Sequence, residues 1–371
     1  MTAIKKQRNA NLDLLRIVSM LLIVFLHSID HSGVLENAEN CSIGMYFYVR
    51  CTYALCQVCV NIYIMLSGYF MINSKFRLHK LVVLWMEAAF YSFVLKLIFM
   101  VTGQESFSVV SLVSCLFPIL TGRYWFLTIY VGMYLISPFL NTLIHAMDKK
   151  RHTLLNICLF AIISMWSSLH PAIAGMNSGG GWGLAWFAVL YITAAWFRLY
   201  YTPSHKSIGW LLIYVAIPVL ITAAQLIVRS LNIGILHAVI TNWFRYDSAP
   251  VYLMTLCLFV GFLNIRVRGE RTSGAIRAVA PLTLGVYLIH AHANVSPWSW
   301  AVLSLPSKMD SPLFPLIQLG AVLVIFWICI IVDALRKRTV GQLENSRWII
   351  AWCEKITAIC SGLLDRIVTG R

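Results

Sequence analysis

The chain has 371 residues, of which 60% are hydrophobic and only 12% are charged. Soluble domains carry about 25% charged residues, so this composition argues against a soluble enzyme and predicts an integral membrane protein. The formal net charge is +15. The basic residues form short clusters between apolar blocks, which favours membrane topology over nucleic-acid binding.

Ten apolar stretches approach the length of about 20 residues that a helix needs to cross a bilayer. They predict an all-α, polytopic membrane protein with spans at 12–30, 46–72, 81–102, 124–145, 153–170, 184–201, 208–228, 249–265, 278–293 and 312–334. The stretch 108–120 is apolar but too short to cross. We expect it to form an interfacial or re-entrant helix on the outer side.

Basic residues set the orientation of these spans, because cytoplasmic segments carry an excess of Lys and Arg. With the basic segment 5–8 inside, every inner segment carries at least two basic residues and no outer segment carries more than two. Counting 108–120 as an eleventh span would move the basic clusters 149–151 and 336–338 outside. Both termini are therefore predicted to be cytoplasmic.

The chain divides into a membrane domain and a tail. Residues 1–339 are expected to form the transmembrane domain, and residues 340–371 an amphipathic helix on the cytoplasmic membrane surface. No predicted outer segment is long enough for a further domain. The tail repeats apolar residues every three or four positions, at Trp348, Trp352, Ile356, Ile359, Leu363 and Ile367.

The first span carries ionisable side chains, which are costly in a bilayer and therefore indicate function. Arg16 and His27 are eleven residues apart. Eleven helical steps end about 20° from where they began, so both face one side of the helix, about 16 Å apart along its axis. Asp13 lies one turn before Arg16 and can pair with it. Alternatively, Arg16 reaches the inner headgroups and His27 bonds a neighbour, but a shared face favours a common pocket.

This first span resembles the opening helix of the acyltransferase-3 family of bacterial membrane acyltransferases, whose hallmark is Arg or Lys, ten residues and then His. Arg16 and His27 fit that hallmark. A second family feature, a serine–glycine motif before basic residues, resembles YIMLSGYFMINSKFRLHK at 63–80. The aromatic YWFL at 124–127 and YLIH at 287–290 are similar to less specific family features. The resemblance covers most of the chain.

The resemblance implies an O-acyltransferase that moves acetyl from cytoplasmic acetyl-CoA to a hydroxyl of a surface glycan or lipid-linked oligosaccharide. It implies a multi-pass protein of the bacterial inner (plasma) membrane, with membrane lipid and glycan as partners, acetyl-CoA as co-substrate and no metal. The alternative is a proton-coupled transporter or exporter of an envelope glycan precursor, since intramembrane histidines and carboxylates also suit proton relays. The acyl group, the acceptor sugar and the oligomeric state stay open.

His27 is the predicted catalytic base, because imidazole titrates near neutral pH; transient acylation of His27 is the alternative. Arg16 is predicted to bind the donor or brace the pocket. Arg77 and Lys80, on the inner side, are candidates for binding the phosphates of CoA, although cytoplasmic loops also carry such charges for topology alone. Lys80 replaces the second Arg of the family motif and lacks its bidentate fork.

Further residues are candidates for contacting the acceptor or the reacting oxyanion. Ser67 and Tyr124, besides Arg16, are alternative donors to the oxyanion of a tetrahedral intermediate. Ser67 with Gly68 is alternatively a small-residue contact between helices. The complete set of predicted substrate-binding residues is Ser67, Arg123, Tyr124 and Trp125.

Other ionisable residues fall within the predicted spans. Glu87 and Lys96 lie about 180° apart on the third span, so they are not expected to pair with each other, and either is a candidate for lining a cavity. His290 and His292 end the ninth span near the outer side. For both histidines a structural role and a second acid–base role stay open.

Overall fold

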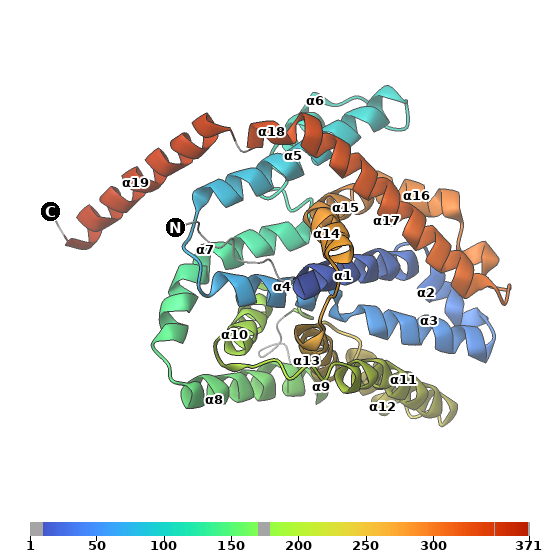
Figure 1. Cartoon of the computed structure of the whole chain (residues 1–371). Helices are drawn as coiled ribbons and strands as arrows, with labels where there is room; N and C mark the ends of the chain where they lie inside the picture. The colour runs from blue at the N-terminus through green and yellow to red at the C-terminus, as the bar shows by residue number, and fades with distance from the viewer. Residues whose placement is uncertain (1–9, 170–178, 345, 370–371) are drawn as a thin grey trace.

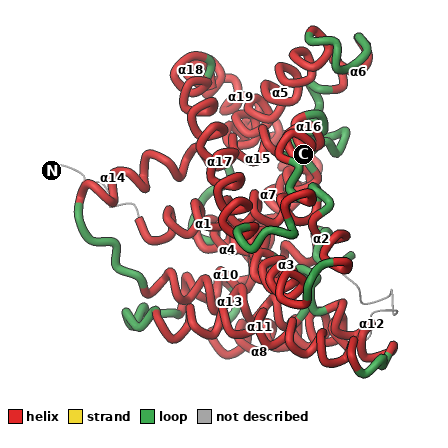
Figure 2. The backbone as a smooth tube through the Cα atoms, turned by 90° about the vertical axis from the view of Figure 1, so that its right-hand side faces the viewer, coloured by secondary structure: helices red, strands yellow, loops and turns green. Residues whose placement is uncertain are grey.

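Residues 10–169, 179–344 and 346–369 are described by a computed structural model, and in them the chain forms helices and loops (Figure 2). The predicted basic segment 5–8 lies outside these residues. In chain order the helices are α1 Ala10–Asp30, α2 Val34–Asn37, η1 Ala38–Asn40, α3 Ile43–Cys56, α4 Val58–Met71, α5 Leu78–Val101, α6 Val109–Ser114, α7 Trp125–His145, α8 Lys149–Leu159, η2 Phe160–Met165, α9 Trp166–Leu169, α10 Leu184–Tyr200, α11 Ile208–Ser230, α12 Gly234–Asn242, α13 Ala249–Asn264, α14 Glu270–Val279, η4 Ala280–Leu282, α15 Thr283–His290, α16 Val295–Leu303, η5 Pro306–Lys308, α17 Phe314–Thr339, α18 Gly341–Glu344 and α19 Arg347–Thr369.

The predicted spans coincide with long helices or with helices joined end to end. Within the described residues, eight helical segments have the length and apolar composition to cross a membrane. The apolar helices α10 and α13 occupy the two remaining predicted spans and are shorter, with 17 and 16 residues. The stretch expected not to cross contains α6, which has six residues. The prediction of an all-α, polytopic membrane protein is confirmed.

Local sequence signals explain where several spans begin. The side chains of Ser42, Asp148 and Ser248 each accept a hydrogen bond from the backbone N–H three residues later, as helix N-caps do. Pro250 lies in the first turn of α13, where its missing N–H leaves no hydrogen bond unmade. Each cap ends a loop and starts the helix that follows.

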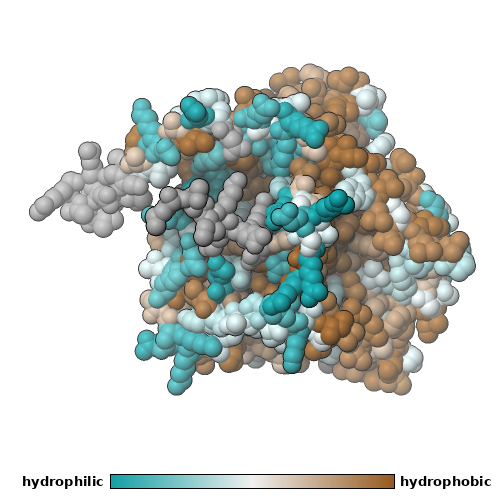
Figure 3. Space-filling view, viewed as in Figure 1, coloured by the Kyte–Doolittle hydropathy of each residue, from teal (hydrophilic) through white to brown (hydrophobic). Residues whose placement is uncertain are grey.

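The two ends of the molecule differ in polarity (Figure 3). We call the end that carries both chain termini and the start of α8 the basic face, and the end that carries α2, α12 and α16 the far face (Figure 1). In the space-filling view, hydrophilic residues gather near the start of α8, and hydrophobic residues dominate toward the far face (Figure 3). The basic face is the side predicted to be cytoplasmic.

Helix α1 occupies the centre of the bundle (Figure 1). It packs against helices from both halves of the chain: α3, α4, α13, α14, α15 and α17. Because protein surrounds this helix, its ionisable residues face other helices or a cavity instead of lipid. Asp13, for example, is 5% exposed.

Interruptions in two of the spans face one cavity. Gln57 separates α3 from α4, and the short helix η4, which contains Pro281, separates α14 from α15. Irregular backbone at membrane depth is tolerated where protein covers it or where it lines a cavity. Gln57 and Pro281 both line the cavity that contains His27.

The tail helix α19 extends away from the bundle (Figure 1). It begins beside α5, which it contacts. Ile349 and Cys353 are buried, whereas Trp348 and Trp352 are exposed. The helix therefore has an apolar surface that the protein leaves uncovered, and its location on the cytoplasmic membrane surface stays a prediction.

Candidate active site

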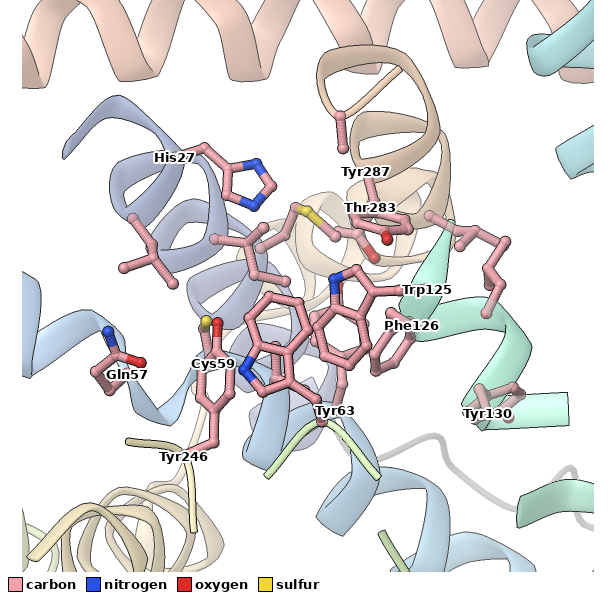
Figure 4. A pocket seen from close by; sticks show the side chains of 18 of the residues that line it. His27, Gln57, Cys59, Tyr63, Trp125, Phe126, Tyr130, Tyr246, Thr283 and Tyr287 are labelled. Atoms are coloured by element: carbon pink, nitrogen blue, oxygen red, sulfur yellow. The ribbon is translucent and has the colours of Figure 1, made fainter. Parts of the chain in front are cut away.

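A cavity of about 830 Å³ lies beside the far-face half of α1, between α1, α4, α7 and α15 (Figure 4). Its lining follows α1 from Arg16 to Asp30, a distance of about 21 Å at the rise of an α-helix. The lining is mostly apolar and aromatic with a few polar groups, as in most small-molecule sites. The cavity therefore extends through much of the length of the first membrane span.

Arg16 and His27 line this same cavity, as their spacing predicted. Nη1 of Arg16 lies 3.7 Å from Oδ1 of Asp13, so the predicted ion pair is present. The hydroxyl of Tyr63 donates a hydrogen bond of 3.4 Å to the backbone carbonyl of Arg16, which ties α4 to α1. Asp13 thus partly neutralises the guanidinium of Arg16 at the basic-face end of the cavity.

The imidazole of His27 is held by two other histidines. Its Nδ1 lies 3.0 Å from Nε2 of His290, the last residue of α15. The ring of His31, one turn further along the chain, stacks on the His27 ring with centroids 4.2 Å apart and planes 19° apart. Contacts at one edge and one face fix the orientation of the ring, which a catalytic base requires.

Close packing of α15 sets the position of His290. At Gly285, an added Cβ would lie 2.7 Å from Oδ1 of Asp333 on α17, so this approach requires a glycine. On the other side, the hydroxyl of Tyr124 donates a hydrogen bond of 2.9 Å to the carbonyl of Leu288. Tyr124, a predicted substrate-binding residue, is therefore buried in helix packing and lies outside the cavity lining.

Aromatic rings cover the far-face part of the cavity. The ring centroid of Trp125 lies 4.3 Å from that of Trp182 and 6.5 Å from that of Tyr246. Trp125 and Tyr246 project into the same space as Phe126 and Tyr63 (Figure 4). Burial raises the pKa of Tyr246, so its phenol stays neutral and can donate a hydrogen bond. The far-face part thus offers flat apolar surfaces beside polar groups.

The match to a protein family extends across the helix bundle. A family model described as an acyltransferase domain matches residues 9–334. The chain belongs to the acyltransferase-3 family. It is accordingly an acyltransferase and a multi-pass membrane protein. No curated protein and no solved structure matches the chain.

In this acyltransferase-3 protein, three of the four predicted substrate-binding residues line the cavity, namely Ser67, Arg123 and Trp125. The side chain of Ser67 donates a hydrogen bond of 2.9 Å to the carbonyl of Tyr63 in its own helix. Nη2 of Arg123 lies 2.6 Å from Oγ of Ser114. The protein thus orients both side chains where they meet the cavity.

The predicted CoA-binding residues Arg77 and Lys80 lie exposed on the basic face, at the start of α5. Neither lines the cavity, but Leu84, one helical turn after Lys80, does. Lys80 is therefore one turn, and Arg77 about two turns, from the cavity wall. Among the residues that the structure describes, no group of three or more His, Cys, Asp or Glu is placed to hold a metal ion.

Some functional candidates have no strong signal in the sequence. Gln57, Asp30 and His31 line the cavity. The rule that polar side chains are costly in spans points to Gln57 and Asp30, whereas His31 falls just beyond the first predicted span. The contact between His290 and His27 joins residues 263 positions apart. The motif at 287–290 marks His290 as notable, but its partner becomes visible in the structure alone.

Proposed function

We propose that this acyltransferase transfers an acetyl group from cytoplasmic acetyl-CoA to a hydroxyl of a cell-surface glycan or lipid-linked saccharide, in the bacterial inner membrane. The observation that carries the proposal is the cavity that holds Arg16 near the basic face and His27 near the far face. In such a cavity a donor from the cytoplasm and an acceptor from outside can meet without either crossing the membrane.

The donor enters from the basic face in this proposal. Arg77 and Lys80 bind phosphate groups of CoA, Lys80 as a point charge and Arg77 with its planar fork. The pantetheine arm extends past Leu84 and Arg16 into the cavity. This route places the thioester between Arg16 and His27, which share one stripe of α1.

The acceptor enters from the far face. Trp125 and Tyr246 offer flat apolar surfaces to a sugar ring, and Arg123 offers hydrogen-bond donors beside them. The acceptor hydroxyl then lies next to His27. Once the acceptor is bound, it and the surrounding aromatic rings keep water from competing for the acyl group.

The chemistry needs a base, an oxyanion donor and a returned proton. His27 takes the proton from the acceptor hydroxyl, whose oxygen attacks the thioester carbonyl. Arg16 donates hydrogen bonds to the oxyanion of the tetrahedral intermediate, since the one hydroxyl proton of Ser67 already bonds to the carbonyl of Tyr63. The carbon–sulfur bond then breaks, the new ester is released, and His27 returns its proton to the sulfur of CoA.

The test is to replace His27 by Ala in cells that make the acceptor glycan, with glycan O-acetylation measured by mass spectrometry. Loss of the base should lower the transfer rate about 10²–10⁴-fold. His237→Ala is a matched control, because His237 is exposed on α12 and lies outside the cavity lining. Normal acetylation by a normally abundant His27→Ala protein would reject the catalytic assignment.

The donor site has its own test in purified protein. Arg77→Glu and Lys80→Glu should weaken acetyl-CoA binding, whereas Lys150→Glu, an exposed change elsewhere on the basic face, should not. Equal affinity in all three variants would reject the phosphate site. Acetyl-CoA labelled in the acetyl group separates transfer from transport, because an exporter leaves no label covalently bound to glycan. Acid quenching within one turnover distinguishes direct transfer from an acyl-histidine intermediate.

A further inference from the structure

We infer that His290 is a positioning residue that fixes the tautomer of His27, so that Nδ1 of His27 carries the proton and Nε2 is the basic atom. The inference rests on the proposed role of His27 and extends it to one ring nitrogen. It follows from three contacts, taken from the backbone toward the cavity.

The first contact fixes the proton on His290. Nδ1 of His290 lies 2.6 Å from the backbone carbonyl oxygen of Val286, one turn earlier in α15. A carbonyl oxygen accepts hydrogen bonds and cannot donate them, so Nδ1 of His290 must be the donor. A neutral His290 therefore has its lone pair on Nε2.

The second contact determines which ring nitrogen of His27 carries the proton. Nε2 of His290 lies 3.0 Å from Nδ1 of His27. Because Nε2 of neutral His290 can only accept, Nδ1 of His27 must donate. Nε2 of His27 is then left unprotonated. Neutral histidine in water favours the opposite tautomer, so the protein holds His27 in the form that it would populate less by itself.

The third contact holds the ring plane. His31 stacks on His27 and places its own Nδ1 3.3 Å from Oγ of Ser296. This second anchor stops the His27 ring from turning about its side-chain bond and exchanging its two nitrogens. The arrangement follows the general logic of a base that a third group orients.

The pair also suits the charge that forms during transfer. When Nε2 of His27 takes the proton of the acceptor hydroxyl, Nδ1–H of the resulting imidazolium still donates to His290. A hydrogen bond from a charged donor is roughly twice as strong as one between neutral groups. His290 thus stabilises the protonated base until the proton passes to the sulfur of CoA.

His292 is a natural comparison two residues away. Its Nδ1 accepts a hydrogen bond of 3.2 Å from the backbone N–H of Asn294, and its Nε2 lies 3.3 Å from the carbonyl oxygen of Ser92. Both ring nitrogens are therefore used by backbone groups. His292 thus links the end of the span to neighbouring backbone, and its hydrogen bonds do not involve His27.

The experiment combines ring-nitrogen NMR with kinetics on the full chain, using protein labelled with ¹⁵N in the histidine rings. At pH 7.5 the His27 signals, identified by their loss in His27→Ala, should show a protonated Nδ1 and an unprotonated Nε2. His290→Phe keeps a ring but removes the acceptor. It should mix the two His27 tautomers and lower kcat about 10²-fold, with the KM for acetyl-CoA unchanged.

Two further variants separate positioning from packing. His290→Gln supplies a carbonyl oxygen in place of Nε2 and should restore much of the kcat lost in His290→Phe, whereas His292→Gln should change neither kcat nor the His27 signals. A protonated Nε2 on wild-type His27, or a folded His290→Phe with wild-type kcat, would overturn the inference. If His290→Phe fails to fold, the wild-type signals still decide. Absence of labelled glycan from wild-type membranes would reject the proposed acceptor, while the nitrogen signals would test the tautomer independently.

Discussion

Lys96 and Glu105 balance a buried charge at the far-face end of α5. Lys96 is 8% exposed, and its ammonium forms a hydrogen bond with the carboxylate of Glu105 in the following loop. Nδ2 of Asn294 donates a second hydrogen bond of 2.7 Å to the same carboxylate. The hydrogen bond from Lys96 is the main reason that the pKa of Glu105 is lowered. The charged form of Glu105 is thus favoured in the folded protein.

This shift predicts how stability depends on acid. A carboxyl group with a lowered folded-state pKa stabilises the protein above its unfolded pKa of about 4.5, and that contribution is lost as the pH falls below it, because the unfolded chain binds the proton first. We expect the thermal midpoint of Glu105→Gln in detergent to fall less between pH 5 and pH 3 than that of the wild type. Glu354→Gln, an exposed change in α19, is the control. Parallel curves for all three proteins would contradict the prediction.

Residue patterns in the sequence predict local geometry well and distant contacts poorly. The shared face of Arg16 and His27 and the pairing of Asp13 follow from the helical repeat, and all are present. The period also excludes a pair between Glu87 and Lys96 correctly, but it does not name their true partners. Glu87 pairs with Arg336 of another helix, and Lys96 pairs with Glu105 in the loop after its own helix; helical periodicity encodes neither contact.

At the level of helices, Gly68 permits the close contact of α4 with α10. A Cβ at this position would lie 2.9 Å from both the Cα and the carbonyl oxygen of Tyr191. Backbone atoms cannot move aside as a flexible side chain can. The neighbouring Ser67 faces the cavity, so the serine–glycine motif combines a cavity residue with a small-residue helix contact.

Gly68→Ala is therefore expected to destabilise the bundle. Overpacking of this kind costs about 1–3 kcal/mol, which a lower midpoint of thermal unfolding in detergent would reveal. Gly44→Ala is the matched control, because nothing lies within 4 Å of a Cβ added there, in helix α3. A midpoint for Gly68→Ala equal to that of Gly44→Ala would show that α4 and α10 can separate without cost.

Hydropathy predicts the spans because each one must match the bilayer by itself. Hydropathy does not predict where a span is interrupted. Pro281 marks the break between α14 and α15, since proline cannot continue a helix without losing a hydrogen bond. The break at Gln57 has no proline or glycine in the apolar run 53–67 to mark it. Its position depends on the cavity that it lines, which forms only when the helices assemble.

Across the whole molecule, Arg336 joins three parts of the fold on the basic-face side. Its Nη2 lies 3.1 Å from Oε1 of Glu87 on α5, and its Nε lies 2.8 Å from Oδ1 of Asp333 on α17. Its Nη1 pairs with the carboxylate of Glu344 on α18. All four side chains are at least 90% buried. Removing the cation would leave three carboxylates buried together.

Arg336→Met should therefore cost about 3–5 kcal/mol, the usual loss when one partner of a buried ion pair is removed. Lower yield of folded protein and a lower thermal midpoint are the expected results. Arg338→Met removes an exposed cation from the same helix and should change neither. If the two variants melt at the same temperature, the cluster does not hold the helices together.

The same cluster affects the insertion of the chain into the membrane during synthesis. Tyr91 on α5 donates a hydrogen bond to Asp333, yet the two residues are 242 positions apart. The ribosome therefore delivers α5 to the membrane, with Glu87 uncompensated, well before α17 exists. An ionised side chain at the centre of an inserting helix costs about 2.5–3.5 kcal/mol. We expect a nascent chain that ends before α17 to keep the Glu87 carboxylate unpaired and to be degraded by membrane proteases. Insertion of the final span should therefore protect the protein from degradation.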